Sequence, residues 1–300
     1  MIRITLVVVT WNQPKLVQKC VETIAAAIEA TSAQIDLRLV NNGGNIETTG
    51  LLHDLPLPAR SRLVHLDRNM GYAGALNHAL SQIELASGDY TVIMNDDVLV
   101  PINFFVNLNA HIREFNKPAL VGFPICESIQ GGSKVTYAMR YWPAASYASP
   151  LRSVPSFKSR CHYWSIDYPC GAIIACRNSF LDRVGAIPAQ NFLYFEELNL
   201  VKAATGCGDF VSICDSVLIR HIGGASTAKL SRRRGAAFYS TVAALRFSLK
   251  HYPVLLPLVL IIRAMFACLK ALQTKNFLPV HAFLLAAKEF LSNPRKSPLQ

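Results

Sequence analysis

The N-terminal third of the chain alternates between short apolar runs and longer segments with apolar positions at helical spacing. The four apolar runs cover residues 4–10, 35–42, 61–67 and 90–95. Residues 14–30 carry a stripe of helical period between the first two runs, and residues 73–85 carry another between the last two. This alternation of strand and helix predicts an α/β fold, a mainly parallel sheet with helices on both faces.

Polar residues and glycines follow these runs at the edge where parallel strands end. The fourth run ends in Asn95, Asp96 and Asp97 instead of continuing as core. The segments after the other runs contribute Thr10, Asn12, Asn42, Asn69, Gly71, Gly74 and Asn77. Glycines permit close backbone approach to a ligand, and the amides that begin a helix attract anions. Because open α/β sheets bind ligands at this edge, we expect a phosphate-bearing compound there.

The second half of the chain is less regular. Residues 136–169 are rich in proline, serine and aromatic side chains without a clear period, which is typical of a functional loop. Farther along, a helix is expected over residues 197–204 and a strand over residues 211–224. The aromatic residues of the loop either form a flat platform for an acceptor or pack the loop onto the sheet. They are Tyr141, Trp142, Tyr163 and Trp164.

The length of the chain and its cysteines limit the classes of protein to which it can belong. At 300 residues the chain is long enough for one large domain, alone or with an appendage. Its eight cysteines show no CxxC pair and no metal-ligand spacing, which indicates the reducing environment of the cytoplasm. The opening MIRITLVVVTWN predicts a first strand instead of a signal peptide.

The excess positive charge is confined to the C-terminal quarter. Residues 1–228 contain 18 Lys and Arg against 18 Asp and Glu, whereas residues 229–300 contain 12 against one, which accounts for the net charge of +11. Such a tail favours an anionic partner, either nucleic acid or a membrane surface. Its basic cluster KLSRRRG lacks the interleaved aromatic residues of single-strand binders, so we expect an anionic membrane surface and no nucleic acid.

The tail pattern predicts helices that lie on the membrane without crossing it. Residues 236–251 form an apolar face with Arg246 and Lys250 off it, as an interfacial helix requires. That face consists of Phe238, Val242, Leu245 and Leu249. The next apolar run is interrupted by Pro253 and Pro257 and closed by Arg263, short of the about 20 residues that span a bilayer. Alternatively, the tail packs on the rest of the chain or on a second subunit, and the oligomeric state is left open.

Several motifs in a fixed order point to one family. They are VVVTWNQPKLVQKCVETI, LVNNGG, NMGYAGALNHAL, MNDDV, FLYFEELNL and RHIGGAS. Over residues 2–226 the chain resembles the family-two glycosyltransferases of GT-A fold, particularly the bacterial rhamnosyltransferase-like members. The resemblance implies a Rossmann-like GT-A catalytic domain over residues 1–228 and a helical tail over residues 229–300.

The resemblance also implies a reaction. A sugar would pass, with inversion, from a UDP- or dTDP-linked donor such as dTDP-rhamnose to a hydroxyl of a glycan or a polyprenyl-linked acceptor. This transfer would serve surface polysaccharide synthesis. The enzyme would be cytoplasmic and peripheral on the inner face of the cell membrane.

A divalent cation, Mg²⁺ or Mn²⁺, belongs to the implied site. Asp97 matches the metal-binding aspartate of the family's DXD-type motif, and Asn95 stands where the first aspartate of that motif often lies. Asp96 is then expected to face the sugar or the ribose. His221 matches a position that binds metal or diphosphate in some relatives, although an isolated histidine is more often a packed, hydrogen-bonded residue. A cation between the phosphates stabilises the leaving nucleoside diphosphate.

The acidic pair in FLYFEELNL matches the catalytic base of the family. Glu197 takes the position of the base, and Glu196 is expected to orient the reactants or to contact the sugar. A glutamate in a partly desolvated cleft has the raised pKa that proton abstraction needs. In the alternative, both are first-turn acids favoured by the helix dipole. Asn199 departs from the family, because many relatives carry an acid there.

The resemblance places the nucleotide at the ends of the first two strands. Asn41 replaces the usual aspartate of the DNGS-like turn, and its amide can both donate and accept hydrogen bonds to uracil or thymine. The positions matching the nucleotide pocket are Thr10, Asn12 and Asn42. Residues expected to bind the nucleotide sugar as well are Asn69, Gly71, Gly74, Asn77, Asn95 and Asp96.

Two other functions compete with this one. Sugar nucleotidyltransferases usually begin with a glycine-rich basic loop after the first strand, whereas this chain has TWNQPK there. A catalytically inactive carbohydrate-binding or scaffold protein of the same fold would tolerate Asn95 and Asn199. Retention of Asp97, Glu197 and His221 favours an enzyme instead.

Overall fold

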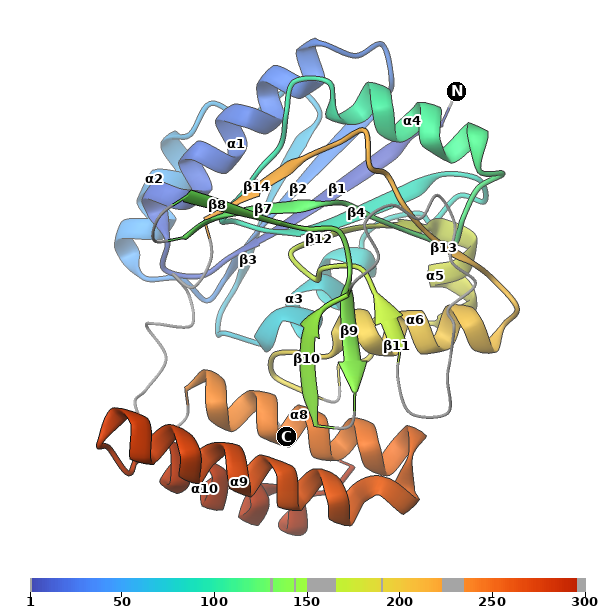
Figure 1. Ribbon diagram of the computed structural model, residues 1–300. Coiled ribbons are helices and arrows are strands. Elements are labelled where there is room, and N and C mark those ends of the chain that lie inside the picture. The colour runs from blue at the N-terminus through green and yellow to red at the C-terminus, as the bar shows by residue number, and fades with distance from the viewer. Residues whose placement is uncertain are drawn as a thin grey trace.

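The main sheet of the protein has seven strands and helices on both faces (Figure 1). The computed structural model describes residues 2–129, 132–142, 144–149, 166–189, 191–222 and 235–295. The strand order is β13-β6-β12-β4-β1-β2-β3, and every strand is parallel to the others except β12. The strands are β1 (Ile4–Thr10), β2 (Ile35–Asn42), β3 (Ser61–Leu66), β4 (Tyr90–Asn95), β6 (Leu120–Gly122), β12 (Ile173–Arg177) and β13 (Val211–Ile213). The predicted α/β fold is therefore confirmed.

Two hydrophobic clusters, one on each face, hold the helices to this sheet. On one face lie α1 (Pro14–Glu29), α2 (Ile46–Asp54) and α4 (Phe104–Glu114). The other face is covered by α3 (Gly71–Leu80), α5 (Asn178–Val184) and α6 (Glu196–Gly206). Every residue of β1 is buried, as expected for a central parallel strand.

The helix expected over residues 73–85 ends earlier than predicted. α3 stops at Leu80, because the next amides turn back in short bonds, from Gln82 to Ala79 and from Ile83 to Leu80. Such bonds tighten the last turn into 3₁₀ geometry and end the helix. Ile83 still packs against the hydrophobic cluster, which explains why its position fitted the apolar stripe.

A small second sheet lies next to the main one and corrects the strand predicted over residues 211–224. That segment forms two strands, of which β13 joins the main sheet and β14 (Ile219–His221) joins the second. The turn over residues 214–218 separates them. The second sheet has the order β5-β14-β7-β8, with β5 (Val98–Leu99), β7 (Ile125–Ile129) and β8 (Gly132–Thr136).

The segment expected to be irregular contains a three-stranded sheet. It consists of β9 (Met139–Trp142), β10 (Ala145–Ala148) and β11 (Ile166–Tyr168). Tyr141 is a core residue, 1% exposed, whereas Trp142 is 47% exposed. The packing alternative therefore holds for Tyr141. Tyr163 and Trp164 lie outside the described residues.

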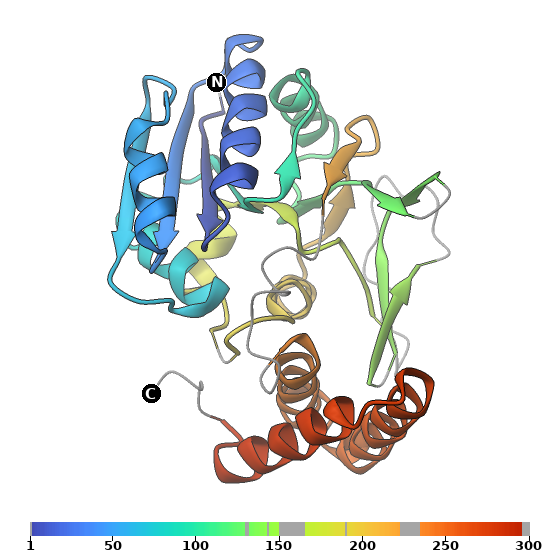
Figure 2. The ribbon, with the colours of Figure 1, turned by 90° about the vertical axis from the view of Figure 1, so that its left-hand side faces the viewer.

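The C-terminal helices stack under the α/β domain (Figures 1 and 2). They are α8 (Ala236–His251), the 3₁₀ turn η1 (Pro253–Leu255), α9 (Leu256–Thr274) and α10 (Leu278–Ser292). Leu245 and Phe247 of α8 belong to the same hydrophobic cluster as α6, and Val242 packs with Ala286 of α10. α8 is thus enclosed between the α/β domain and the last helices.

The prediction that α8 is an interfacial helix with Arg246 off its apolar face is wrong. Arg246 is 2% exposed, donates a hydrogen bond to the backbone oxygen of Asn293 at 2.9 Å and lies 3.8 Å from Glu289. A buried guanidinium is tolerated here because the C-terminal end of α10 supplies acceptors and negative potential. Lys250 is exposed, as expected.

The apolar run after α8 is also longer than predicted. Pro253 opens η1 and Pro257 lies in the first turn of α9, where a proline interrupts no helical hydrogen bond. Arg263 does not close the run, and helix continues over Pro253–Thr274, 22 residues whose most apolar 18-residue window has a mean hydropathy of 2.2. By length and composition this helix is long enough to cross a membrane.

Candidate active site

A cavity of about 390 Å³ lies at the carboxyl ends of β1, β2 and β4. Most of the residues singled out in the sequence meet there, although they come from five separate elements or turns. Those that line the cavity are Asn42, Asn69, Gly71, Asn95, Asp96, Asp97, Glu196, Glu197 and His221. Thr10, Asn12, Gly74 and Asn77 are not among its lining residues.

Thr10 and Asn12 support the cavity from behind its wall. The Thr10 hydroxyl donates a 2.6 Å hydrogen bond to Asp96 Oδ2, and both residues are buried. Asn12 has a left-handed backbone with φ of 55° and accepts a hydrogen bond from the amide of Asn45. In this structure, Thr10 therefore reaches the cavity only through Asp96.

Gly74 and Asn77 lie farther along α3. Asn77 is bonded to the backbone of Ile187 through both ends of its amide, at 2.8 and 2.9 Å. A β-carbon at Gly74 would meet Met70 Cβ at 3.1 Å, so this glycine leaves room for the side chain of Met70, the residue that precedes α3. These two positions fix the helix in place, while the loop before it faces the cavity.

That loop is held by a cluster of amides. Asn42 Nδ2 donates to Asn69 Oδ1 at 3.1 Å and to the backbone oxygen of Gly71 at 3.2 Å, and Asn42 Oδ1 accepts from the amide of Met70. Gly71 has φ of +75°, and a β-carbon there would lie 2.4 Å from the backbone oxygen of Phe192. Only glycine fits this position, because any side chain would be both strained and in collision.

The two aspartates after β4 have different surroundings. Burial raises the pKa of Asp96 to about 7, although the hydrogen bond from Thr10 opposes the shift and the charge of Asp97 adds to it. Asp97 is 6% exposed, and its Oδ1 accepts no hydrogen bond within the part of the chain that the structure describes. The imidazole of His221 lies beside it, with Nε2 at 3.3 Å from that oxygen.

These atoms fit a divalent cation. A buried carboxylate oxygen without a hydrogen bond, next to an imidazole nitrogen, offers one oxygen and one nitrogen ligand of the kind that Mn²⁺ accepts. Among the described residues, no group of three or more His, Cys, Asp and Glu side chains is arranged to hold a metal. The protein would therefore supply only part of the coordination, as is usual where substrate phosphates and water complete it.

Glu196 and Glu197 begin α6 after a strained turn. Tyr194 and Phe195 have left-handed backbones, with φ of 76° and 72°, and non-glycine residues in this region cost about 1–3 kcal/mol each. Asn191 holds the turn by donating to the backbone oxygen of Tyr194. Strain of this kind persists only where the surroundings fix it, and here it places both carboxylates in the cavity.

Burial raises the pKa of both glutamates, and the charge of Glu197 raises that of Glu196 further. Glu196 is 6% exposed, and its Oε1 has no hydrogen-bond partner among the described residues. Gly171 leaves the room for Glu197, because a β-carbon there would lie 3.1 Å from its carboxylate. The pair thus stands in the first turn of a helix, as the alternative expected, and also faces the cavity.

Tyr72 is a cavity residue that sequence reasoning missed. Its hydroxyl oxygen is buried without a hydrogen bond inside the described ranges, and burial, with Glu196 next, raises its pKa well above the ordinary value. A buried hydroxyl without a partner is costly, and such groups often await a ligand. Its place directly after Gly71, in the glycine-containing turn, was the signal available in the sequence.

The departure at Asn199 has a structural reason. Asn199 Nδ2 donates to the backbone oxygen of Phe195 at 2.7 Å, and its Oδ1 lies 3.2 Å from Nε2 of His251 in α8. Burial, together with Lys250 and Lys202, lowers the pKa of His251 to about 4, so its neutral ring can donate to this amide oxygen. Asn199 therefore links the strained turn to the C-terminal helices.

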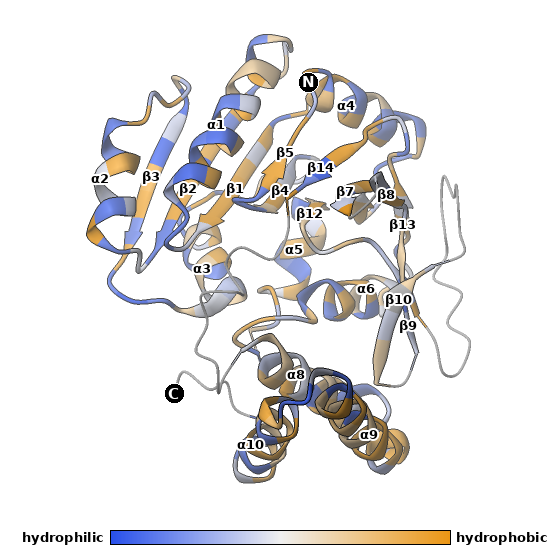
Figure 3. Ribbon diagram, turned by 60° about the vertical axis from the view of Figure 1, so that its left-hand side comes forward, coloured by the Kyte–Doolittle hydropathy of each residue, from blue (hydrophilic) through white to orange (hydrophobic). Residues whose placement is uncertain are grey.

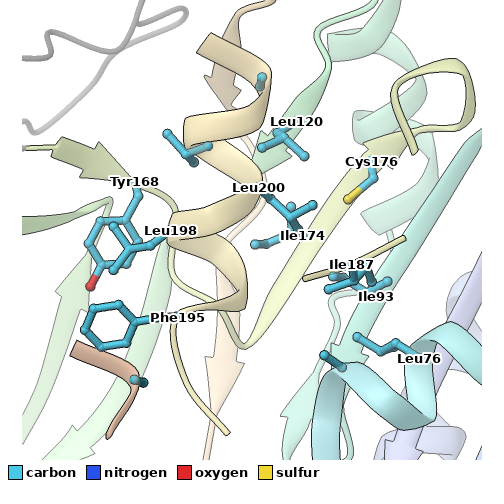
Figure 4. Packing of buried hydrophobic residues seen from close by; sticks show 14 of the residues in the cluster. Leu76, Ile93, Leu120, Tyr168, Ile174, Cys176, Ile187, Phe195, Leu198 and Leu200 are labelled. Atoms are coloured by element: carbon cyan, nitrogen blue, oxygen red, sulfur yellow. The ribbon is translucent and has the colours of Figure 1, made fainter. Parts of the chain in front are cut away.

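Packing supports the same link. Phe195 and Leu198 lie beside Tyr168 of β11 in the cluster under α6 (Figure 4). The ring centroid of Phe195 is also 5.5 Å from that of Phe247 in α8 and 5.4 Å from that of Tyr141. The carboxylate pair is thus supported by helix α8 as well as by the main sheet.

Residues 5–185 match the sequence model of the family described as glycosyl transferase family 2. The match covers more than half of the chain. The chain belongs to glycosyl transferase family 2. None of the curated proteins compared with it matches.

Solved structures give the fold of this family-2 chain. S. aureus TarS 1–349 in complex with UDP-GlcNAc superposes with a TM-score of 0.56 at 13% identity over 84% of this chain and 68% of TarS 1–349. The mannosyltransferase PcManGT from Pyrobaculum calidifontis, in complex with GDP-Man and Mn²⁺, gives 0.51 at 15% identity over 96% of this chain and 75% of its own. GalNAc-T7 with UDP, GalNAc and Mn²⁺ gives 0.58 at 15% identity over 74% and 44%.

These similarities confirm the GT-A fold with a helical C-terminal region. The chain spans 64% of another TarS 1–349 structure and 39% of the longer TarS structure. At such identities the neighbours show architecture alone, and the reaction of this chain is argued from its own residues below.

Proposed function

We propose that this glycosyltransferase moves a sugar from a nucleoside diphosphate sugar to a hydroxyl acceptor with inversion. The observation that carries the proposal is the meeting of two acidic pairs, Asp96–Asp97 and Glu196–Glu197, in one cavity at the end of the sheet, with Glu197 partly buried and the other three buried. One pair has a free carboxylate oxygen for a cation, and the other has carboxyl groups with raised pKa values. Structural neighbours in complex with UDP-GlcNAc, and with GDP-Man and Mn²⁺, support the same chemistry.

The donor end of the site is assigned to the loops after β1, β2 and β4. Asn42, Asn69 and Gly71 would bind the nucleotide sugar, with Thr10 and Asn12 holding their surroundings in place. Asp97 and His221 would hold Mn²⁺ or Mg²⁺. When bound, this cation supplies positive charge against the diphosphate as it leaves.

The acceptor end is assigned to α6. The acceptor oxygen forms a bond to the anomeric carbon while the bond from that carbon to the diphosphate breaks, and the diphosphate keeps the electron pair. Glu197 takes the proton of the acceptor hydroxyl, and Glu196 orients the sugar. Attack from the face opposite the leaving group inverts the anomeric centre.

We also propose a specific class of donor and of acceptor. Asn41 does not read the base as expected, because its amide is 2% exposed and bonded to Thr49, His65 and the amide of Gly44. On the family resemblance, a UDP- or dTDP-linked sugar, with dTDP-rhamnose as the specific candidate, is the proposed donor. The proposed acceptor is a glycan on a polyprenyl lipid, in cell-surface polysaccharide synthesis in a bacterium. A lipid-linked acceptor would have to reach the cavity from a membrane surface.

The C-terminal helices offer such a surface. α9 and α10 are strongly apolar (Figure 3), and their exposed large side chains form what we name the tail apolar face. Its residues are Leu258, Leu260, Ile261, Met265, Phe266, Leu269, Leu272, Phe277, Leu278, Leu284 and Leu291. Exposed Lys270, Lys275 and Lys288 on the same segments complement anionic lipid. We assign this face to the cytoplasmic surface of the cell membrane.

Asp97→Ala tests the assignment of the cation. The wild type should release nucleoside diphosphate from UDP- or dTDP-sugars only with Mn²⁺ or Mg²⁺, and the variant should release none. Full release in excess chelator would contradict the metal assignment. Tight donor binding without any release in the wild type would favour the inactive carbohydrate-binding alternative.

A further inference from the structure

The second sheet places three titratable side chains in a row across neighbouring strands. Asp97 directly precedes β5, and His221 of β14 pairs with Val98 of β5 on one side. On its other side His221 pairs with Glu127 of β7. A hydrogen bond from the amide of Ile222 to the backbone oxygen of Asp97, at 2.9 Å, fixes this register next to the cavity.

The two ring nitrogens of His221 face different carboxylates. Nδ1 lies 3.0 Å from Glu127 Oε1, and Nε2 lies 3.3 Å from Asp97 Oδ1. An ionised carboxylate only accepts hydrogen bonds, so either nitrogen could donate to the carboxylate that it faces. A neutral ring has one proton, and the shorter contact, at 3.0 Å against 3.3 Å, favours its place on Nδ1. Nε2 then remains the nitrogen that can present a lone pair toward Asp97.

We propose that Glu127 is a positioning residue for the metal site, which keeps the proton of His221 on Nδ1 and its Nε2 directed at the cation beside Asp97. The inference rests on the cation site assigned above. A neutral imidazole carries one proton, and the hydrogen bond made by one nitrogen decides which nitrogen is free to bind metal. Glu127 itself does not line the cavity, and its side chain is 46% exposed.

An alternative explanation is a plain cross-strand charge pair. Glu127 faces Lys134 on β8, and opposite charges on neighbouring strands stabilise a sheet without any role at the cavity. The two explanations differ in what happens when His221 is absent. A positioning role acts only through His221, whereas a cross-strand pair acts without it.

Binding of Mn²⁺, alone and with UDP or dTDP, separates the two in the full-length chain. Glu127→Gln should weaken Mn²⁺ binding about 10-fold, the lower end of the usual range for such partners, because Glu127 is half exposed. In a His221→Ala background the same substitution should have no further effect. Lys134→Gln and the exposed Glu114→Gln serve as controls and should leave Mn²⁺ affinity unchanged.

A second readout needs no metal. The ¹⁵N chemical shifts of the His221 ring, recorded above the pKa of the ring, report which nitrogen carries the proton. The wild type should show protonated Nδ1, and Glu127→Gln should shift the population toward protonated Nε2, because an amide can donate as well as accept.

The outcomes distinguish this inference from the proposed function. Unchanged Mn²⁺ affinity in Glu127→Gln, an equal loss in the His221→Ala background, or a wild-type ring protonated at Nε2 would overturn the role of Glu127 alone. Absence of Mn²⁺ binding by the wild type, with UDP or dTDP present, would overturn the cation site itself and this role with it.

Discussion

At the scale of single residues, buried polar atoms without partners mark the cavity. Asp97 Oδ1, Glu196 Oε1 and Tyr72 Oη are all buried and lack hydrogen bonds among the described residues, and all three residues line the same cavity. Each such atom costs about 1–3 kcal/mol of folding free energy. Other atoms of this kind lie elsewhere among the described residues, but these three meet in one cavity, where a polar ligand would complete them.

Tyr72→Phe tests this interpretation through two effects of opposite sign. Removing a buried hydroxyl without a partner should leave stability unchanged or raise it by up to about 1 kcal/mol in urea unfolding. The same change should weaken binding of the donor, because the hydroxyl is lost as a ligand contact. Tyr90→Phe is the control, since the Tyr90 hydroxyl donates to the backbone oxygen of Pro118 and its loss should destabilise the fold.

A Tyr72→Phe variant that is less stable than the wild type, and binds the donor equally well, would show that the hydroxyl is a structural group.

At the scale of elements, periodicity predicted those parts whose burial is uniform along the segment. β1, β2 and β4 are buried almost throughout, and α1 buries one stripe, so their patterns were readable. The strand expected over residues 211–224 failed because two short strands from different sheets are joined there by a turn that contains Asp215 and Ser216. Strands of three residues are too short to show a period.

The candidate site was predictable only where motifs mark it. Asp97 and Glu197 stand in motifs, whereas Glu127 lies in a strand without any special pattern and reaches His221 only through strand pairing. Arg246 was placed off the apolar face from helical spacing, which does not say whether a helix is covered on one side or on two. α8 is covered on both, so spacing alone misplaced Arg246.

The link between α6 and α8 predicts a pH effect on stability. The folded chain keeps His251 neutral down to about pH 4, whereas its ordinary pKa in the unfolded chain is 6.5. The unfolded state therefore binds more protons between these values, and the stability contributed by this group falls as pH is lowered through that window. His251→Gln, which keeps a donor toward Asn199, should flatten this part of the stability curve.

Thermal unfolding from neutral pH down to about pH 4.5 measures the effect. The exposed His281→Gln should retain the wild-type slope and controls for histidine loss in general. If His251→Gln left the slope of stability against pH unchanged, the surroundings of His251 between α6 and α8 would not be what keeps this histidine neutral.

At the scale of the whole molecule, the C-terminal region has two parts with different surroundings. α8 is enclosed and supports the turn before Glu196, whereas only 11% of the most apolar window of Pro253–Thr274 is buried. An exposed apolar surface of this kind usually marks a site that binds a protein partner or a membrane. Because Lys270, Lys275 and Lys288 are exposed alongside it, we propose that an anionic lipid surface binds the tail apolar face.

Ile261→Glu combined with Phe266→Glu tests whether the tail apolar face binds lipid. Each change places a charge where an apolar side chain would enter lipid, at a cost of about 1.5 kcal/mol or more, so the vesicle-bound fraction should fall about 10-fold or further. Sedimentation with phosphatidylglycerol vesicles measures binding. Ile46→Glu, at a still more exposed apolar position on α2, should bind as the wild type does.

A wild-type chain that ignores these vesicles and forms a dimer, which the Ile261→Glu and Phe266→Glu pair disrupts, would show that a second copy covers the tail apolar face instead.

The central claim is that Glu197, beside Glu196, takes the proton of the acceptor in a glycosyl transfer. The most direct test is the turnover of Glu197→Gln and Glu196→Gln, measured as sugar transfer or nucleoside diphosphate release with Mn²⁺ present. Glutamine preserves size and hydrogen bonding but does not accept the proton, so Glu197→Gln should lower turnover about 10²-fold or more while donor binding changes little. The account predicts a smaller loss for Glu196→Gln. Wild-type turnover in Glu197→Gln would contradict it, and a larger loss in Glu196→Gln would exchange the two roles.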